Sequence, residues 1–339
     1  MLILAIETSC DETSAAVVKD GVEVLSNPIA TQTEFHQKYG GIVPEIAARK
    51  HVELISPIIQ EALDKANITF KDIDAVAVTY GPGLIGSLIV GVCAAKAIAW
   101  TQKIPLIGVN HLEGHIYANL LISNFQFPIS NLFPFLCLLV SGGHTMIVHV
   151  KGHGNYETLG RTRDDAAGEA FDKVARVLGL GYPGGPLIDK LAKEGNPNSI
   201  PFKHPMIEGE YAYDFSFSGI KTAVVNHVKS LQSTVNSVQK KNIAASFQKV
   251  VVETLVEKLI KAAKDKNVQT VSIAGGVSAN SELREYAQKR ADEEKLKAMI
   301  PPFEYCTDNA AMIGGAAYYK FKRKDFSPLS LKPLASLRL

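Results

Sequence analysis

The sequence predicts an α/β protein with two lobes, each built around a mixed β-sheet, and a cleft between the lobes. Each half of the chain opens with short apolar runs separated by polar turns, which is typical of antiparallel strands. Each half then alternates helical periodicity with further apolar runs, the spacing of a parallel crossover unit. Because this order of elements occurs twice, we expect one structural unit used twice.

The first half is expected to form a three-stranded antiparallel meander, followed by a helix, a strand, a helix and a strand. The first helix begins near Pro44 and carries apolar residues at helical spacing. The residues expected on its buried face are Val52, Ile55, Ile59 and Leu63. The other strands and helices expected in this half are 2–6, 15–18, 22–25, 75–78, 84–101 and 105–109.

The second half repeats the order but carries an insertion, roughly 164–238, before its long helix. That helix is marked by Ile243, Phe247, Val251, Leu255 and Leu259. The other elements expected here are 135–140, 146–150, 156–159, 268–274, 280–290, 297–300 and 310–319. We expect an N-terminal lobe of residues 1–110, completed by a C-terminal helix over 308–325, and a C-terminal lobe of 111–307.

Composition is that of a soluble globular protein. The 339 residues are 46% hydrophobic and 21% charged, enough for two hydrophobic cores. The cysteines are scattered without a CxxC pair, so we expect a reducing, cytoplasmic location. The start of the chain lacks a signal-peptide pattern, and the apolar stretch 84–100 is interpreted as a buried helix and not a membrane span. The net charge of +2 neither demands nor excludes nucleic acid.

The segment Asn110-His111-Leu112-Glu113-Gly114-His115 is the first candidate functional site. In a helix, His111 and His115 lie four residues apart on one face, so both imidazoles can bind one metal ion. The alternative is a pair of partly buried histidines that hydrogen-bond backbone carbonyls. The pair alone does not decide between these two interpretations.

Asp308 is the candidate for a third ligand. It follows the last strand of the second half, as His111 follows the last strand of the first, and such strand ends should meet at the cleft. Two histidines and one carboxylate leave coordination positions open for substrate, as in a catalytic metal site. The alternative role of Asp308 is the N-cap of the helix that follows it.

Three turns have the character of an anion-binding site. The segment 141–145, Ser-Gly-Gly-His-Thr, lies between two strands, and its amides and hydroxyls can donate to a phosphate. The segment 275–280 leads into a helix, whose N-terminus favours an anion. Asp11 and Glu12 lie in the first meander turn and can hold a cation or accept a proton. Each turn alone can be an ordinary glycine turn, but together they predict a nucleotide clamped between the lobes.

The repeated meander with these turns resembles the actin and sugar-kinase superfamily of ATP-binding folds. Six longer motifs are similar to those of the tRNA N6-adenosine threonylcarbamoyltransferase family, in its bacterial or organellar branch. They are GIVPEIAARKH (41–51), NHLEGH (110–115), LVSGGHT (139–145), DDAAGEAFDKVARVLGLGYPGGP (164–186), FSFSGIKTAV (215–224) and AGGVSAN (274–280). They occur in order over nearly the whole chain.

This resemblance implies transfer of the threonylcarbamoyl group of threonylcarbamoyl-AMP to the N6 amine of the adenosine beside the anticodon, in tRNAs that read codons beginning with A. It implies one divalent metal on His111, His115 and Asp308, with Fe²⁺ favoured and Zn²⁺ as the alternative. The implied substrate-binding residues are Leu139, Val140, Ser141, Gly142, Gly143, Asp172, Gly185, Asp189 and Asn280. The implied partners are tRNA, an inactive paralogue of the N-terminal half, a P-loop ATPase and a separate threonylcarbamoyl-AMP synthase, with no membrane.

The chemistry agrees with these residue types. An aromatic amine is a poor nucleophile, so a metal that polarises the carbonyl and amides that stabilise the leaving AMP would both help. Asp11 or Glu12 would take the amine proton, and the sequence does not choose between them. Arg49, Lys221 and the basic run 320–324 can contact RNA, or can be ordinary surface charges.

Two other functions compete with tRNA modification. The histidine pair suggests a metalloprotease, but an HExxH site needs Glu directly after the first histidine, and here Leu112 stands there, with Glu113 one position later. The fold suggests a small-molecule kinase of the same superfamily, because a fold does not fix a function.

Overall fold

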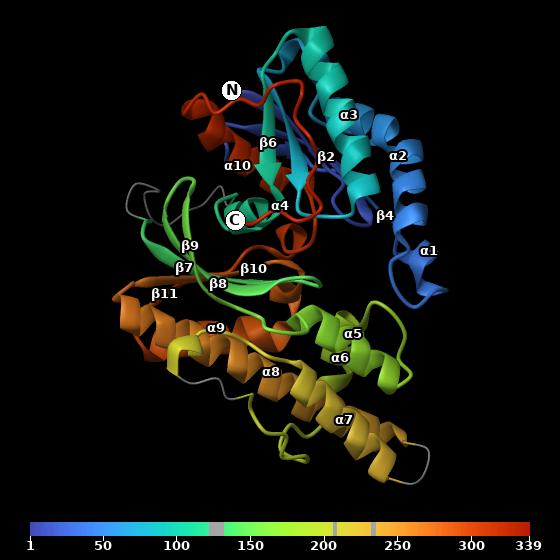
Figure 1. Cartoon of the computed structure of the whole chain (residues 1–339), viewed down its shortest axis with the longest axis vertical. Coiled ribbons are helices and arrows are strands. Elements are labelled where there is room, and N and C mark those ends of the chain that lie inside the picture. The colour runs from blue at the N-terminus through green and yellow to red at the C-terminus, as the bar shows by residue number, and fades with distance from the viewer. Residues whose placement is uncertain (122–131, 206–208, 232–234) are drawn as a thin grey trace. The chain divides into compact units, whose positions relative to one another are not determined.

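The computed structural model describes residues 1–121, 132–205, 209–231 and 235–339 (Figure 1). The chain forms two compact units: unit 1 is Met1–Pro128 with Pro301–Leu339, and unit 2 is Ile129–Ile300. These divisions differ from the expected ones, which lie at 110 and 308. Helix α4 (His111–Ala118) packs against α10 (Ala310–Lys322), and this contact places α4 in unit 1.

Unit 1 contains one mixed sheet in the order β3-β2-β1-β5-β6. Its strands are β1 (Leu2–Glu7), β2 (Glu12–Lys19), β3 (Glu23–Ser26), β4 (Ile29–Thr31), β5 (Ala75–Gly81) and β6 (Leu106–Asn110). Strand β1 is antiparallel to β2 and parallel to β5, which is parallel to β6. The predicted meander is therefore confirmed. The short strand β4, which pairs with β2, was not expected.

Unit 2 repeats this topology. Its sheet has the order β9-β8-β7-β10-β11, with β7 antiparallel to β8 and parallel to β10. The strands are β7 (Phe135–Val140), β8 (Thr145–Gly152), β9 (Asn155–Arg161), β10 (Thr270–Ala274) and β11 (Lys297–Met299). Position by position this is the order of unit 1, so the predicted duplication is confirmed.

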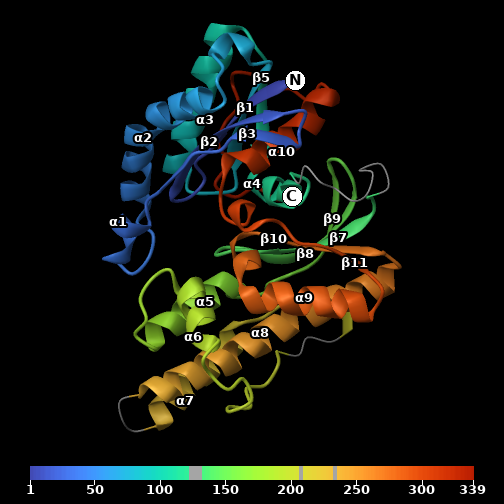
Figure 2. The same ribbon diagram turned by 180° about the vertical axis from the view of Figure 1, so that it is seen from behind.

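Helices surround the two sheets (Figures 1 and 2). Unit 1 also contains α1 (Thr33–Gln37), α2 (Pro44–Lys65), η1 (Phe70–Asp72), α3 (Ile85–Gln102) and η5 (Phe303–Tyr305). Unit 2 contains α5 (Ala167–Val177), α6 (Gly184–Ala192), η3 (Gly209–Tyr211), α7 (Ser218–Ser230), α8 (Ser237–Lys266), η4 (Gly276–Ala279) and α9 (Ser281–Glu293). The insertion supplies α5, α6 and α7. All five apolar residues that marked α8 are buried in the core of unit 2.

The buried face of α2 differs from the expected one. Val52 is 64% exposed, whereas His51 is fully buried. Nδ1 of His51 lies 2.8 Å from Thr13 Oγ1, and its Nε2 lies 3.0 Å from the carbonyl oxygen of Cys10. Successive residues are turned by about 100° around a helix, so packing His51 towards the sheet turns Val52 to the surface.

Helix α3 packs beside α2 and is buried along one face only (Figures 1 and 2). Leu88, Val92 and Ala95 lie in the core, but Ile89 and Trp100 are 46% and 71% exposed. Among the described residues it is the one helix long and apolar enough to cross a membrane by length and composition, and 33% of it is buried. The stretch predicted to form a buried helix therefore forms a helix with one face in the core and an apolar face that is exposed.

Candidate metal centre and substrate site

Helix α4 presents the two predicted histidines on one side. The helix follows β6 without a loop, and Asn110 caps it by accepting a hydrogen bond from the N–H of Leu112 at 2.8 Å. His111 and His115 are 8% and 0% exposed, and their ring centroids lie 4.6 Å apart. The spacing that predicted a shared ligand position therefore brings both rings together.

The start of α10 is held by three side chains. The N–H groups of Ala310, Ala311 and Met312 donate to Ser14 Oγ, Asn27 Oδ1 and Asn309 Oδ1, at 3.0, 3.2 and 3.0 Å. Asn309 is thus the N-cap, and the alternative interpretation of Asp308 as the cap is wrong. Because the amides of the first turn are already bound by other side chains, the Asp308 carboxylate is directed elsewhere.

Gly114 allows α10 to approach α4 closely. A Cβ atom at this position would lie 2.6 Å from Ile313 Cδ1, so a side chain there would have to displace the Ile313 side chain of α10. This contact brings the residues just before α10 next to the histidines. All three predicted ligands therefore belong to unit 1, and the expectation that they meet across a cleft between the two halves is corrected.

The three side chains form one group with metal-binding geometry. Asp308 Oδ1 lies 3.2 Å from His115 Nε2 and 3.5 Å from His111 Nε2. One ligand atom from each residue falls within 4.8 Å of the others. His115 Nε2 is fully buried and has no hydrogen-bond partner among the described residues. Buried polar atoms normally have a partner, and a cation bound by both His115 Nε2 and the Asp308 carboxylate would provide one.

The charges around this group favour a cation. Burial lowers the pKa of His115 and so favours its neutral, metal-binding form. Burial also opposes charge on His111, but the carboxylates of Asp308 and Glu7 outweigh it and raise the pKa of His111 to about 9. The Asp308 and Glu7 carboxylates therefore stabilise a positive charge at this position. A protonated His111 supplies that charge in the absence of metal, and a divalent cation would also supply it.

Glu7 and Ser9 lie behind His111 and were not found from the sequence. Glu7 Oε2 and Ser9 Oγ are each 3.1 Å from His111 Nδ1. Burial opposes ionisation of Glu7, but the charge of His111 holds the pKa of Glu7 below its ordinary value. The only sequence signal is an acidic residue at the end of an apolar strand.

Asp11 and Glu12 lie at the start of β2, in unit 1. Asp11 is buried, and Glu12 accepts a hydrogen bond from the Thr31 hydroxyl at 3.4 Å. Burial, and then the neighbouring Asp11 carboxylate, raise the pKa of Glu12 well above its ordinary value. The sequence did not reveal this raised pKa of Glu12.

In unit 2, two glycine turns meet at the carboxyl ends of adjacent parallel strands. Strands β7 and β10 pair with Leu139 opposite Ala274, and the turns begin directly after them. Gly275 has φ +87°, and a Cβ atom there would lie 2.5 Å from the carbonyl oxygen of Val140. The start of α5 lies beside the first glycine turn, because the Gly168 N–H donates a hydrogen bond to the Ser141 carbonyl oxygen at 3.2 Å. Ends of parallel strands at one edge are the usual place for a ligand in α/β sheets.

Three predicted substrate residues hold neighbouring helices in place. Asp172 Oδ1 accepts the N–H of Gly184 at 2.7 Å and so ties α5 to the start of α6. Gln248 joins the other two: its Nε2 donates to Asp189 Oδ1 at 3.2 Å, and its Oε1 accepts from Asn280 Nδ2 at 2.7 Å. Sequence reasoning missed Gln248, although a glutamine beside Phe247 in an apolar helical repeat was a usable signal.

The glycines of this region face open space. Positions where a Cβ atom would have no protein atom within 4 Å include Gly142, Gly143 and Gly185. The backbone at these places is accessible to a ligand, which suits amides that approach a phosphate closely.

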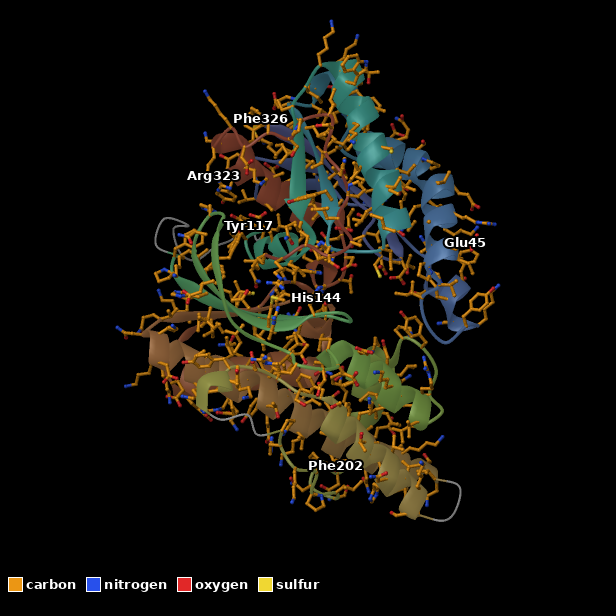
Figure 3. The ribbon with its side chains drawn as sticks, viewed as in Figure 1. Glu45, Tyr117, His144, Phe202, Arg323 and Phe326 are labelled. Atoms are coloured by element: carbon orange, nitrogen blue, oxygen red, sulfur yellow. The ribbon has the colours of Figure 1, made fainter. Side chains whose placement is uncertain are left out.

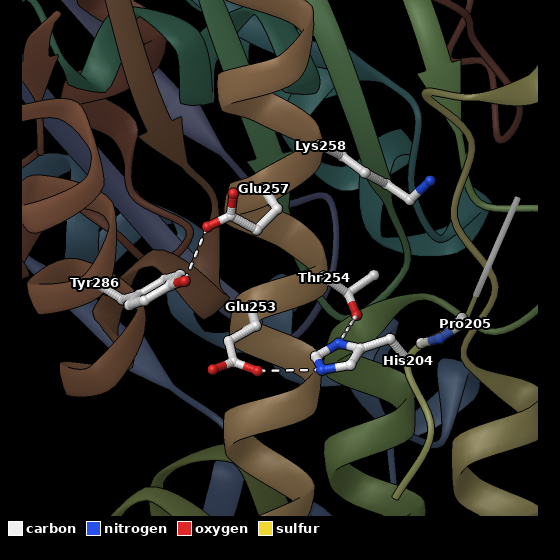
Figure 4. Close-up of a pocket in the computed structure, with 7 residues that line it drawn as sticks. All are labelled: His204, Pro205, Glu253, Thr254, Glu257, Lys258 and Tyr286. Carbon is white, nitrogen blue, oxygen red and sulfur yellow. Dashed lines mark hydrogen bonds and ion pairs between the residues drawn. The ribbon is translucent and has the colours of Figure 1, made fainter. Parts of the chain in front are cut away.

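A separate hollow of about 400 Å³ lies in unit 2 and contains none of the predicted site residues (Figure 4). Its polar groups are satisfied within the protein: His204 pairs with Glu253 at 3.2 Å, and the hydroxyl of Tyr286 donates to Glu257 at 2.8 Å. Figure 3 shows the side chains of both units, with His144 of the first glycine turn labelled.

The duplicated sheets define the actin and sugar-kinase class of α/β proteins. The chain is similar in structure to component A of (R)-2-hydroxyglutaryl-CoA dehydratase from Acidaminococcus fermentans, with a TM-score of 0.54 and 16% identity over 96% of this chain and 99% of that one. It is also similar to HypF of T. kodakarensis, with a TM-score of 0.63 and 14% identity over 98% of this chain and 50% of that one. These likenesses show the fold alone.

The family model for tRNA N6-adenosine threonylcarbamoyltransferase matches residues 23–315. Enzymes of this name from Clostridium novyi (strain NT) and Clostridium botulinum (strain Kyoto) are 53% and 54% identical over 99% of this chain and 97% of theirs. The chain belongs to the tRNA N6-adenosine threonylcarbamoyltransferase family. It is an acyltransferase of tRNA modification, and the kinase and protease alternatives are set aside.

Proposed function

We propose that the chain transfers the threonylcarbamoyl group of threonylcarbamoyl-AMP to the N6 amine of the adenosine beside the anticodon, in tRNAs that read codons beginning with A, and releases AMP. The observation that carries this proposal is the set of two buried histidines and one partly buried carboxylate in a chain of this family. A small-molecule kinase would not require such a set.

His111, His115 and Asp308 would hold one divalent cation through Nε2, Nε2 and a carboxylate oxygen. We propose Fe²⁺ in the first place and Zn²⁺ as the alternative, since imidazole and carboxylate suit both. When bound, the cation supplies a Lewis acid that can polarise the carbonyl or hold the phosphate and threonyl oxygens. The protein's part is to hold the three ligands rigidly. Three features serve this end: the cap of α4, the three hydrogen bonds at the start of α10, and the contact at Gly114.

The donor nucleotide would bind in unit 2, against the backbone of 139–143. Amides of this turn, together with the starts of α5 and α9, would stabilise the negative charge that develops on the departing AMP. Asp172, Asp189 and Asn280 would line this site with Gly185. Their existing hydrogen bonds to the protein hold them in place before the donor binds, so little ordering remains for the binding step.

Glu12 is the better candidate for the proton acceptor. A base is most effective when its pKa lies near the working pH, and the pKa of Glu12 is raised towards that range by burial and by Asp11. The amine loses a proton as its nitrogen bonds to the carbonyl carbon, and the Glu12 carboxylate would take that proton. Asp11 would orient the acceptor and keep the pKa of Glu12 raised.

The uncovered apolar face of α2 and α3 fits a partner protein. Val52, Ile85, Ile89 and Trp100 are 64%, 48%, 46% and 71% exposed. We propose that the inactive paralogue of the N-terminal half covers this face, because a homologous unit carries equivalent helices. A P-loop ATPase and a separate threonylcarbamoyl-AMP synthase would complete the system. We place it in the cytoplasm with its tRNA substrate.

The test is a reconstituted reaction. The chain is incubated with tRNA, threonine, bicarbonate, ATP and the partner proteins, and the nucleosides are analysed by mass spectrometry. We expect threonylcarbamoyladenosine only when this chain is present. If the mixture forms no more of it than the same mixture without the chain, the proposed function is wrong.

A further inference from the structure

Glu7 is a fully buried carboxylate at the end of β1 with a defined set of donors. Its Oε1 accepts the N–H of Ser9 at 2.5 Å, and its Oε2 accepts the hydroxyl of Thr79 at 2.6 Å. An ionised carboxylate is an acceptor only, and both oxygens here face donors. Glu7 is therefore placed to accept further hydrogen bonds and not to give one.

The further contact of Glu7 is His111. The distance from Oε2 to His111 Nδ1 is 3.1 Å. Since the carboxylate has no proton to donate, the proton of this hydrogen bond belongs to Nδ1. The Ser9 hydroxyl, also 3.1 Å from Nδ1, can donate or accept and so follows the tautomer that Glu7 imposes. Nε2, on the side that faces Asp308, is then the nitrogen that gives up its proton and offers its lone pair when a cation binds.

The two histidines differ in this respect. Neither ring nitrogen of His115 has a hydrogen-bond partner among the described residues. His115 is held by its fully buried position in α4. His111 is also oriented by the charge of Glu7 and by hydrogen bonding to Glu7 and Ser9. The centre therefore has one ligand whose tautomer is set by a named side chain.

We propose that Glu7 is a positioning residue of the metal centre: it keeps the proton of His111 on Nδ1, so that Nε2 binds the cation. Ser9 N–H and the Thr79 hydroxyl hold the carboxylate in this position. The inference rests on the metal centre proposed above and adds to it a residue that does not touch the metal. Carboxylates behind metal-bound histidines act in this way by fixing the ring and its tautomer.

The first test measures Zn²⁺ affinity by competition with a chromogenic chelator. Glu7→Gln keeps the shape of the side chain, but its amide can donate to Nδ1 and favour a proton on Nε2. We expect the Kd for Zn²⁺ to rise about 10–100-fold. Ser26→Ala is the matched control, because it also removes a buried side-chain hydrogen bond of unit 1, from the Ser26 hydroxyl to the Ala62 carbonyl oxygen, but leaves Glu7 and His111 unchanged. Its effect on the Kd should be much smaller, and Glu7→Asp, which keeps the charge, should recover part of the affinity.

The second test needs no variant at this position. In the Zn²⁺-loaded wild-type protein with ¹⁵N-labelled histidine, we expect His111 to show a protonated Nδ1 and a metal-bound Nε2. Coordination through Nδ1 would overturn the inference, whether or not the Glu7 variants fold. So would an unchanged Kd in folded Glu7→Gln while Asp308→Ala abolishes binding, a result that leaves the metal centre standing. If the wild-type protein binds no Zn²⁺, the metal centre and this inference fail together.

Discussion

Asp308 Oδ1 lies 3.2 Å from His115 Nε2, although the two residues belong to the two chain segments of unit 1 that unit 2 separates in the sequence. Asp308 can serve as a ligand because its neighbour Asn309 caps α10. Ligand and cap are therefore two adjacent residues with separate tasks, and this separation can be tested.

Asp308→Ala should abolish tight metal binding and leave the fold largely intact. Loss of a partner behind a ligand typically lowers metal affinity about 10–100-fold, so loss of a ligand should lower it by at least ~100-fold. Asn309→Ala is the matched control: it removes the cap and should destabilise the protein by about 1–2 kcal/mol. It should nevertheless retain one metal per folded molecule. Elemental analysis and thermal unfolding of both variants decide the matter, and equal metal content in Asp308→Ala and wild type would show that Asp308 is not a ligand.

Glu12→Gln should make the metal-free protein more stable at pH 8 while it lowers activity. The pKa of Glu12 is raised in the folded protein, first by burial and then by Asp11, so the folded state holds this proton more tightly than the unfolded state. Stability therefore falls as pH rises above the ordinary value of 4.5 towards the raised value, because ionised Glu12 is unfavourable in its buried place. The variant lacks this penalty. Its advantage in melting temperature should be largest at pH 8 and should shrink towards pH 4.5.

Glu304→Gln, at an exposed position of unit 1, serves as the control for this experiment. Melting curves of the three proteins at several pH values give the comparison. A Glu12→Gln advantage that stays constant with pH would contradict the raised pKa.

Gly185→Ala should weaken donor binding without disturbing the fold. A Cβ atom at Gly185 meets no protein atom within 4 Å, so a loss of affinity would report contact with the ligand itself. We expect the KM for threonylcarbamoyl-AMP to rise at least about tenfold, which corresponds to ~1.4 kcal/mol. Gly219→Ala is the matched control, since Gly219 is also the second residue of a helix and faces open space. An equal KM in both variants would remove Gly185 from the donor site.

Ile89→Glu should abolish binding of the paralogue to the α2–α3 face. Ile89 is 46% exposed in the middle of α3, and a charge there would have to be buried by the partner. Val238→Glu introduces the same charge at a 65% exposed position of α8, a helix of unit 2 that is not part of the α2–α3 face, and should bind normally. Sedimentation of each variant with the paralogue provides the measurement. Undiminished association of Ile89→Glu would move the interface elsewhere.

The elements that were expected from local pattern are mostly observed. Alternating apolar runs and turns predicted β1, β3 and β7 to within one residue at each end, because each pattern depends on neighbours along the chain, whereas β2 begins three residues before its predicted start. The repeat of that order predicted the duplicated topology. Helix α2 was also expected, and Ile55, Ile59 and Leu63 lie on its buried face as predicted. Val52 is exposed instead, because His51 packs against Thr13 and Cys10.

The sequence by itself determined the order of strands and helices, the spacing that puts His111 and His115 on one face, and membership of the family. Only the tertiary structure decided that Asn309 and not Asp308 caps α10, and that Glu7 lies behind His111 and Gln248 between Asp189 and Asn280. These relationships join residues that are far apart in the chain, or choose between two adjacent residues. They follow from how helices and strands pack against one another, which the periodicity of a single element does not contain.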